Sequence, residues 1–202
     1  MHKLIFATGN KNKMREIREI LGSLPCEITS MKEEGLDPEI LEDGKTFEEN
    51  ALIKARAVAA ALKPGCEAIV LADDSGLEID ALDKEPGIHS ARYMGEDTSY
   101  EIKNANLLSR MEGVPVEKRT ARFVCAIAAV LPDGQEHIVR ETIEGRIGYE
   151  PRGKNGFGYD PIFYLPDMSC STAELDPEEK NRISHRGKAL EAMEKELAGL
   201  FS

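Results

Sequence analysis

The stretch of sequence that most strongly decides the fold is Ala-Ile-Val-Leu-Ala-Asp-Asp-Ser-Gly-Leu, residues 68–77. Its first five residues form a short apolar run, which predicts a buried strand of an α/β sheet. The Asp-Asp-Ser-Gly sequence that follows predicts a break in the strand, because these residue types are common in turns. Apolar residues alternate again from Leu77 to Ala81, which predicts a second, half-buried strand. The acidic residues are therefore expected at the carboxyl end of a strand, where α/β sheets bind ligands.

Upstream of this stretch, the chain shows the same order of strand, turn and helix. Residues 3–7 predict a short buried strand, which Thr8-Gly9-Asn10 breaks before a helix with apolar residues at core spacing. Thr46 and Glu49 form a capping box that opens a second helix, and the Pro-Gly pair at residues 64–65 ends it.

Downstream, helices and strands continue to alternate. Thr98 and Glu101 form another capping box, which opens a helix that runs to about Met111. Two segments, residues 119–131 and 138–143, flank a Pro-Asp-Gly turn and predict a long β-hairpin.

The C-terminal part begins with a glycine-rich loop at residues 153–158, followed by a predicted strand at residues 162–165. Asp176 and Pro177 begin a helix, since Pro is favoured at the first helical position. The apolar positions of a last amphipathic helix are Leu190, Met193, Leu197 and Leu200. Without any linker or repeat, we predict one α/β domain over residues 1–202, with an elongated mixed sheet flanked by helices.

Composition excludes several classes of protein. The chain has a formal net charge of −11, which argues against binding to a nucleic acid polymer, because that requires a basic face. The longest apolar run, residues 123–131, is too short to span a membrane, and the N-terminus lacks the apolar region of a signal peptide. Its four cysteines are far apart and form no C-x-x-C pair, so we expect free thiols and a cytoplasmic location.

Two segments carry candidate groups for phosphate and metal. The first comprises Thr8, Gly9, Asn10, Lys11, Asn12 and Lys13. Amides at a helix start and two lysines suit a phosphate, although Asn10 can equally be a simple N-cap beside solvated lysines. The second is the pair Asp73 and Asp74, whose carboxylates suit Mg²⁺ or a general base, with an acidic turn as the alternative. Glu42 from an acidic loop can complete a metal site, and Lys54 either reaches it or lies along the surface.

Two further segments offer groups for a base or a phosphate. Residues 153–160 combine three glycines with two aromatic side chains, which suits a flat ring, although the pattern alone slightly favours a bulge or tight hairpin. Lys180, His185 and Arg186 supply cations and donors, whereas charges at helix ends are more commonly just solvated.

Six segments carry a resemblance that extends over essentially the whole chain. They are Thr8-Gly9-Asn10-x-x-Lys13, Thr46-Phe47-x-Glu49-Asn50-Ala51-x-x-Lys54-Ala55, Ala72-Asp73-Asp74-Ser75-Gly76-Leu77, Pro86-Gly87-Ile88-x-Ser90-Ala91-Arg92-Tyr93, Gly156-Phe157-Gly158-Tyr159-Asp160-Pro161 and Ser184-His185-Arg186. In this order they resemble the inosine triphosphate pyrophosphatases, also called dITP/XTP diphosphatases.

The resemblance implies an Mg²⁺-dependent enzyme that hydrolyses ITP, dITP and XTP to the monophosphate and pyrophosphate. It also implies two lobes with a central cleft, and a homodimer. Asp74 would accept the proton of the attacking water, Asp74 and Glu42 would hold Mg²⁺, and Ser75 would contact the substrate. Residues 8–13 would bind the triphosphate, with Lys13 as the principal cation. The implied nucleoside pocket consists of Phe157, Gly158, Tyr159, Asp160, Lys180, His185 and Arg186.

Two other functions are alternatives at this stage. One is a related pyrophosphatase that acts on modified pyrimidine triphosphates, although the motifs of that group are absent. The other is a non-catalytic nucleotide sensor, against which the acidic pair argues. Asp73 and Lys54 are additional candidates for contacts to metal or phosphate, and Mn²⁺ is a candidate to replace Mg²⁺.

Overall fold

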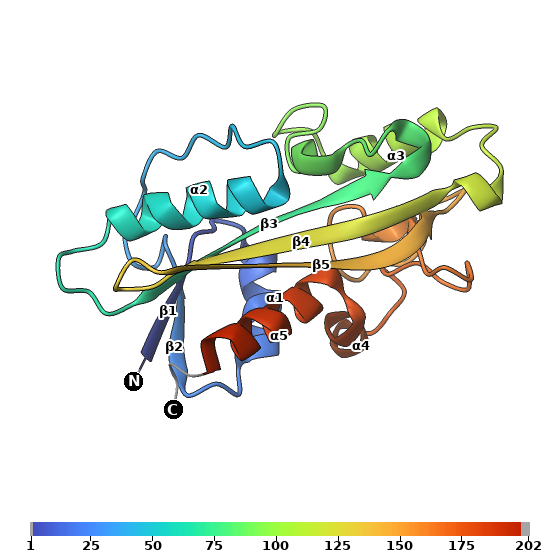
Figure 1. The fold of residues 1–202 in the computed structure, drawn as a ribbon. Coiled ribbons are helices and arrows are strands. Elements are labelled where there is room, and N and C mark those ends of the chain that lie inside the picture. Colours follow the sequence, from blue (N-terminus) through green and yellow to red (C-terminus); the bar gives the residue numbers. More distant parts are fainter. Residues whose placement is uncertain (1, 199–202) are drawn as a thin grey trace. The chain divides into compact units, whose positions relative to one another are not determined.

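The structure is a computed structural model that describes residues 2–198 (Figure 1). Its strands are β1 (His2–Phe6), β2 (Cys26–Ser30), β3 (Ile69–Ile79), β4 (Thr120–Val130), β5 (Glu136–Ile147) and β6 (Phe163–Tyr164). The α-helices are α1 (Lys11–Leu21), α2 (Phe47–Ala60), α3 (Tyr100–Arg110), α4 (Pro177–Ile183) and α5 (His185–Leu197). The strands form one sheet in the order β2-β1-β3-β4-β5-β6. Because β1 is parallel to β2 and β3 while β5 is antiparallel to β6, the predicted mixed α/β sheet is confirmed.

The chain divides into two compact units. Unit 1 consists of residues 1–74, 125–141 and 186–202, and unit 2 consists of residues 75–124 and 142–185. The strands β3, β4 and β5 contribute residues to both units. Each unit has its own apolar core.

In unit 1, helices cover both faces of the strands, with α1 and α5 on one face and α2 on the other (Figure 1). One of its core clusters joins α1 and α5 to alternate residues of β1, β3 and β4, as the two-residue period of a strand requires. Its helical members include Met14, Ile17, Leu21, Leu190, Met193 and Leu197, so the predicted apolar faces of α1 and α5 are confirmed. Leu200 lies outside the described residues.

The core of unit 2 joins α3 to β3, β4 and β5. Its buried members are Leu77, Ile79, Leu107, Met111, Ala121, Phe123, Ile143, Ile147, Tyr159, Ile162 and Phe163. Tyr159 is thus a core residue, although it belongs to the glycine-rich loop. Tyr159 therefore packs the glycine-rich loop against α3.

The main difference from the sequence-based expectation is that β3 does not break. It runs unbroken over Ile69–Ile79 through the Asp-Asp-Ser-Gly sequence, so the predicted turn and the second predicted strand were wrong. The strand continues despite the turn propensity of these residues, because each carboxylate pairs with a lysine. A paired charge is tolerated inside a buried strand.

Several smaller differences concern element ends. The strand β2 was not predicted, and β6 is shorter than the predicted strand at residues 162–165. Ser99, rather than Thr98, caps α3, because its side chain accepts a hydrogen bond from the Ile102 amide. Thr98 instead donates its hydroxyl to the Met94 carbonyl oxygen at 2.7 Å.

Other local predictions are confirmed. Thr46 caps α2 by accepting from the Glu49 amide at 3.1 Å, although Glu49 reaches back to the Lys45 amide rather than to that of Thr46. The helix ends at Ala60, a few residues before the predicted Pro-Gly stop. Asp176 caps α4, and β4 and β5 are neighbours joined by the predicted tight turn.

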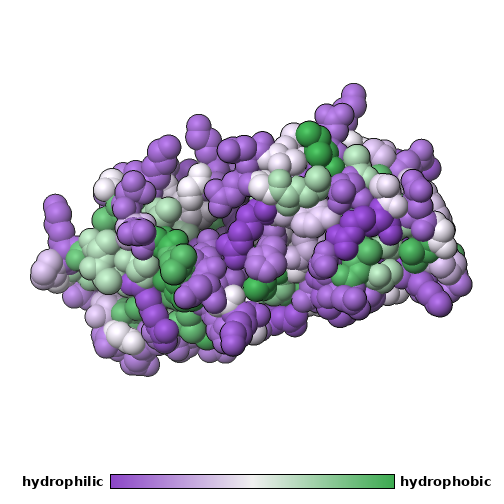
Figure 2. All heavy atoms as spheres, turned by 90° about the horizontal axis from the view of Figure 1, so that it is seen from above, coloured by the Kyte–Doolittle hydropathy of each residue, from purple (hydrophilic) through white to green (hydrophobic). Residues whose placement is uncertain are grey.

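The surface carries few large apolar groups. On the face drawn in Figure 2, hydrophilic side chains dominate and apolar ones form small separate groups. Cys26, Cys66, Cys125 and Cys170 are free thiols, and Cys125 is fully buried as expected of a core residue. Among residues 2–198, no helix combines the length and the apolar character needed to cross a membrane.

Candidate active site

The loop between β1 and α1 caps the helix that follows it. Asn10 Oδ1 accepts hydrogen bonds from the amides of Asn12 and Lys13, at 2.9 and 3.2 Å. Thr8 Oγ1 accepts from the Asn10 amide at 3.1 Å, which fixes the capping residue itself. The interpretation of Asn10 as an N-cap is thus confirmed, and the amides of Asn10, Asn12 and Lys13 are already engaged.

Two other amides of this loop face solvent. Gly9 and Lys11 are exposed, and no residue in the described part of the chain accepts a hydrogen bond from either amide. Both donors lie at the positive end of the α1 dipole, which favours an anion. The loop therefore retains the groups that a phosphate needs, in addition to the N-cap.

Lys13 belongs to a buried charge cluster in unit 1. Its Nζ lies 3.0 Å from Asp73 Oδ2, and the same oxygen accepts from Arg186 Nη2 at 3.2 Å and Nε at 3.3 Å. Arg186 Nη1 donates to Glu16. Burial by itself would raise the pKa of Asp73, but Lys13 and Arg186 hold it well below its usual range. Burial likewise opposes the charge of Arg186, yet Asp73 and Glu16 raise the pKa of this guanidinium.

Asp74 lies in a second cluster, formed with α2 and the acidic loop. Lys54 Nζ lies 2.9 Å from Asp74 Oδ1 and 3.1 Å from Glu42 Oε2. Asn50 Nδ2 donates to Asp74 Oδ2 at 3.4 Å, and Asn50 Oδ1 accepts from the Gly44 amide at 3.0 Å. Burial raises the pKa of Asp74, and the nearby Lys54 offsets only part of this effect. Lys54 keeps its charge, because Asp74 and the other carboxylates raise its pKa against the effect of burial.

The two adjacent carboxylates serve different clusters. Successive side chains of a strand point to opposite faces of the sheet, and β3 continues through both residues. Asp73 accordingly meets Lys13 from α1 and Arg186 from α5, while Asp74 meets Lys54 from α2. Our placement of both carboxylates at a strand end was therefore wrong, because the strand extends past them.

The glycine-rich loop of unit 2 is organised around a buried ion pair. Lys180 Nζ lies 2.7 Å from Asp160 Oδ2, which also accepts from the Phe157 amide at 2.8 Å. Asp160 Oδ1 accepts from Thr172 Oγ1 at 2.9 Å. The ammonium of Lys180 lies 5.2 Å from the centroid of the Phe157 ring, which is half-buried and keeps part of its surface open. Gly156 and Gly158 take φ angles of +71° and +68°, which side chains with a Cβ atom rarely adopt.

Two other ring side chains of this unit, Tyr159 and His185, are buried. The Tyr159 hydroxyl donates to the Ser90 carbonyl oxygen at 2.6 Å, and its ring meets that of Tyr100 edge-on at 5.1 Å. His185 stacks on Phe123 with ring centroids 4.9 Å apart. Of the two aromatics that we considered for a base, Phe157 is half-buried, whereas Tyr159 has its hydroxyl engaged and only 4% of its surface exposed.

The implied site residues are distributed over both units. Unit 1 contains residues 8–13, Glu42, Asp74 and Arg186, whereas unit 2 contains Ser75, residues 157–160, Lys180 and His185. Within unit 1 the structure brings Glu42 and Asp74 together through Lys54, and within unit 2 it brings Asp160 and Phe157 together with Lys180.

Sequence reasoning did not single out Glu16 and Asn50. Glu16 is 5% exposed on α1, and only its position between buried neighbours distinguishes it from an ordinary helix-surface glutamate. Asn50 lies four residues before Lys54 on α2, so helical spacing places both on one face. That spacing is a usable signal, because two polar side chains on a buried helical face require a common polar partner.

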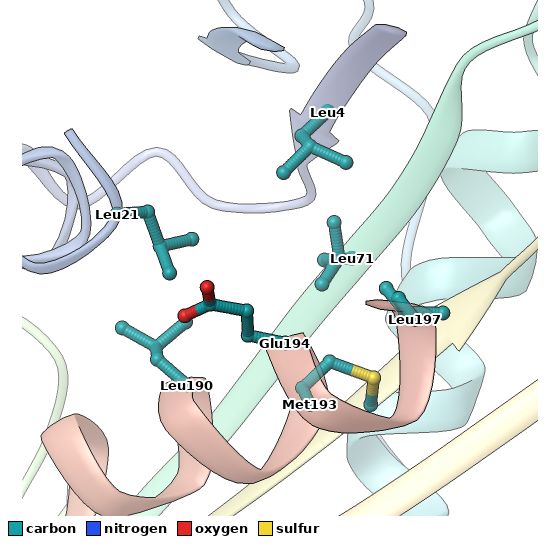
Figure 3. Close-up of a pocket in the computed structure, with 7 residues that line it drawn as sticks. All are labelled: Leu4, Leu21, Leu71, Leu190, Met193, Glu194 and Leu197. Carbon is teal, nitrogen blue, oxygen red and sulfur yellow. The ribbon is translucent and has the colours of Figure 1, made fainter. Parts of the chain in front are cut away.

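An apolar pocket between α1, α5, β1 and β3 is not suited to a nucleotide (Figure 3). It is lined by Leu4, Leu21, Leu71, Leu190, Met193, Glu194 and Leu197. Its one charged side chain is a carboxylate, which would repel a phosphate. The charged clusters around Asp73 and Asp74 remain the better candidates.

Comparison with known proteins places these clusters in a family. The sequence model of the Ham1 family matches residues 4–196. A dITP/XTP pyrophosphatase from Geobacter sulfurreducens is 50% identical over 98% of this chain and 97% of its own length. Another, from Exiguobacterium sibiricum, is 47% identical over 96% of each chain.

Solved structures agree with these relatives. A HAM1 protein from Coxiella burnetii is 42% identical, with a TM-score of 0.85 over 98% of this chain and 100% of that chain. The Ham1 protein of Staphylococcus aureus is 39% identical, with a TM-score of 0.85 over 98% and 99% of the two chains. The resemblance drawn from six sequence segments is thus confirmed over nearly the full length, and the chain belongs to the Ham1 family.

Proposed function

We propose that this protein is a nucleoside triphosphate pyrophosphatase, which hydrolyses dITP, XTP and ITP to the monophosphate and pyrophosphate. The observation that carries the proposal is the contact of Lys54 with both Asp74 and Glu42, because it shows two carboxylates converging on one cation in a buried setting. Relatives about half identical over nearly their whole length are named dITP/XTP pyrophosphatases. Neither a pyrimidine-specific enzyme nor a non-catalytic sensor is favoured by any comparable observation.

The triphosphate is assigned to the loop of residues 8–13 and to Lys13. The open amides of Gly9 and Lys11 and the α1 dipole supply donors that suit phosphate oxygens. Lys13 adds a cation whose Nζ is held by Asp73, so its position is set before the substrate arrives. Such fixed donors stabilise the charge that develops on the bridging oxygens as the bond to the α-phosphorus breaks.

Asp74 is assigned as the group that accepts the proton of the attacking water. Its pKa is raised by burial, which brings it nearer to neutral pH, as an effective general base requires. Asn50 donates to one oxygen of this carboxylate, and Lys54 contacts the other. These contacts fix the carboxylate in orientation, so it can position a water molecule without side-chain rearrangement.

Mg²⁺ fits the donor set of this cluster. Asp74 and Glu42 supply carboxylate oxygens, the ligand type that Mg²⁺ prefers, and they already share one cation, Lys54. In residues 2–198 no group of three or more His, Cys, Asp or Glu side chains is arranged to hold a metal. Two carboxylates therefore suit an ion that takes its other ligands from water and substrate phosphates. When bound, Mg²⁺ supplies charge stabilisation to the phosphate oxygens.

The nucleoside is assigned to Phe157–Asp160, Lys180 and His185 of unit 2, with Ser75 of the same unit as a further contact. The partly open ring of Phe157 suits a stacked base, and the buried Lys180–Asp160 pair fixes the loop that carries it. Donors that match a 6-oxo purine leave unpaired polar atoms when they face the amino group of adenine. Mismatches of this kind can reduce kcat/KM by orders of magnitude, which would spare ATP.

We further propose a cytoplasmic location and a homodimer. The four free thiols support the location, since oxidising compartments favour disulfides. The dimer is supported by the family resemblance.

A substrate panel tests the proposed function. The purified protein would be assayed with ITP, dITP, XTP, GTP and ATP in the presence of Mg²⁺, and the products would be separated by chromatography. We expect the monophosphate and pyrophosphate from the three deaminated nucleotides, at far higher kcat/KM than from GTP or ATP. Release of single phosphates, or equal turnover of all five, would contradict the assignment.

A further inference from the structure

A set of three hydrogen bonds connects three segments of unit 2. Asn104 Nδ2 on α3 donates to the Gly158 carbonyl oxygen at 3.1 Å, and Lys103 Nζ donates to the Ala91 carbonyl oxygen at 2.7 Å. The Tyr159 hydroxyl donates to the Ser90 carbonyl oxygen at 2.6 Å. Thus α3 is hydrogen-bonded both to the loop at residues 86–93 and to the glycine-rich loop, and a third hydrogen bond joins the two loops. The first of these loops is a motif that the proposed function leaves without a role.

Asn104 contacts the glycine-rich loop at Gly158, the residue type with the widest choice of backbone conformations. Gly158 has a φ of +68° and lies between Phe157, the candidate stacking ring, and the buried Tyr159. On one side, Asp160 holds the Phe157 amide. The bond from Asn104 fixes the carbonyl in the middle, so it determines how the peptide plane between Gly158 and Tyr159 is oriented.

The orientation of the Asn104 amide is dictated by its partner. A carbonyl oxygen only accepts hydrogen bonds, so the NH₂ group of Asn104 must face Gly158. Asn104 Oδ1 is buried and has no hydrogen-bond partner among the described residues. Burying an amide group is costly, and a leucine would serve as well if packing were the only need. The bond to Gly158 is therefore the polar contact that requires an asparagine at this position.

We propose that Asn104 is a positioning residue for nucleoside recognition, which acts by holding Gly158 and, through it, the half-buried ring of Phe157. This inference rests on the proposed function, because it takes the glycine-rich loop to be the nucleoside-binding segment. It predicts that loss of the bond weakens interactions with the nucleoside part of a substrate and leaves those with its phosphates unchanged.

The decisive variant is Asn104→Asp, which keeps the shape but places a carboxylate against the Gly158 carbonyl oxygen. The matched control is Asn106→Asp, the same change on the same helix, where Asn106 accepts from the Tyr93 hydroxyl rather than bonding to the glycine-rich loop. For both variants, kcat and KM for ITP and inhibition by pyrophosphate would be measured. Deuterium uptake of the peptide covering residues 156–162 gives a readout that is independent of activity.

We expect Asn104→Asp to raise KM for ITP roughly tenfold, which corresponds to about 1.4 kcal/mol, with kcat within about threefold of wild type. Inhibition by pyrophosphate, which has no base, should not change, and residues 156–162 should exchange faster. Asn106→Asp should match wild type in every readout. Equal KM and equal exchange for the two variants would overturn the proposal.

A second variant covers the case in which the aspartate variant does not fold. Asn104→Ser withdraws the donor from Gly158 without adding charge, and we expect the same direction of change in KM and exchange. Loss of folding in both variants would also overturn the proposal, because Asn104 would then support the whole unit rather than the loop. Wild-type protein that fails to hydrolyse ITP would refute the proposed function instead, while the exchange comparison would still test the role of Asn104.

Discussion

Lys54 and Asp74 face each other in a buried setting, with Nζ 2.9 Å from Oδ1, and the same ammonium lies 3.1 Å from Glu42. A lysine in this position reduces the repulsion between two carboxylates. It also competes with any divalent cation for the same oxygens.

Asp74→Asn should nearly abolish catalysis without unfolding the protein. The amide keeps the shape of the side chain but accepts protons poorly, so kcat for ITP should fall by about 10²–10⁴. Asp43→Asn, an exposed neighbour of Glu42 in the acidic loop, is the matched control and should keep wild-type kcat. Turnover of Asp74→Asn at the wild-type rate would remove Asp74 from the reaction.

Lys54→Met should bind Mg²⁺ more tightly than wild type does in the absence of substrate. Removing the ammonium leaves Glu42 and Asp74 as two negative groups with no shared counter-ion, and a divalent cation relieves their repulsion. Thermal unfolding would be followed with and without Mg²⁺, and the rise in Tm on adding the metal should be larger in the variant. In wild type, EDTA should abolish ITP hydrolysis and Mg²⁺ should restore it. Full activity with EDTA would contradict the metal assignment.

Arg186→Ala should lower stability and alter its dependence on pH. It removes the guanidinium partner of Glu16 and one of the cations beside Asp73, and breaking a buried pair of this kind costs about 3–5 kcal/mol. The pKa of Asp73 is lower in the folded protein than in the unfolded chain, so wild-type stability should fall as the pH drops below about 4. The variant raises this pKa and should show a shallower fall. Parallel Tm curves from pH 3 to 7 would contradict the charge cluster.

Lys103→Met and Lys180→Met should differ in their effect on the free energy of unfolding, although both lysines are buried in unit 2. Lys180 pairs with the buried Asp160, so its removal should cost about 3–5 kcal/mol. Lys103 donates to the carbonyl of the exposed Ala91, which water can replace, and burial lowers the pKa of this ammonium. Removing Lys103 should leave the free energy of unfolding unchanged or raise it. Denaturant unfolding of both variants is the measurement, and equal losses would refute the distinction.

Much of the fold could be predicted from local patterns. The caps at Thr46 and Asp176 and the tight turn between β4 and β5 were visible because each depends on residues within a few positions of one another. The sequence alone could not distinguish Thr98 from Ser99 as the N-cap of α3. Both hydroxyls can cap, and the outcome depends on the Met94 carbonyl that Thr98 binds instead.

The candidate site was less predictable, because its partners are distant in the chain. Adjacent acidic residues are typical of a turn. Inside β3 their charges are stabilised by ion pairs with Lys13, Lys54 and Arg186, which come from three different helices. That the side chains of Asp73 and Asp74 point to opposite faces of the sheet could not be predicted either, because it depends on β3 continuing through both residues.

The unbroken course of β3 restricts how the gene can change in length. Inserting or deleting one codon shortly before Asp73 would turn every later side chain of the strand to the other face of the sheet, so each carboxylate would meet the cations meant for its neighbour. A change of two codons would preserve the faces and only shift the residues along the strand. Natural and engineered length variation in this segment should therefore come in pairs of residues.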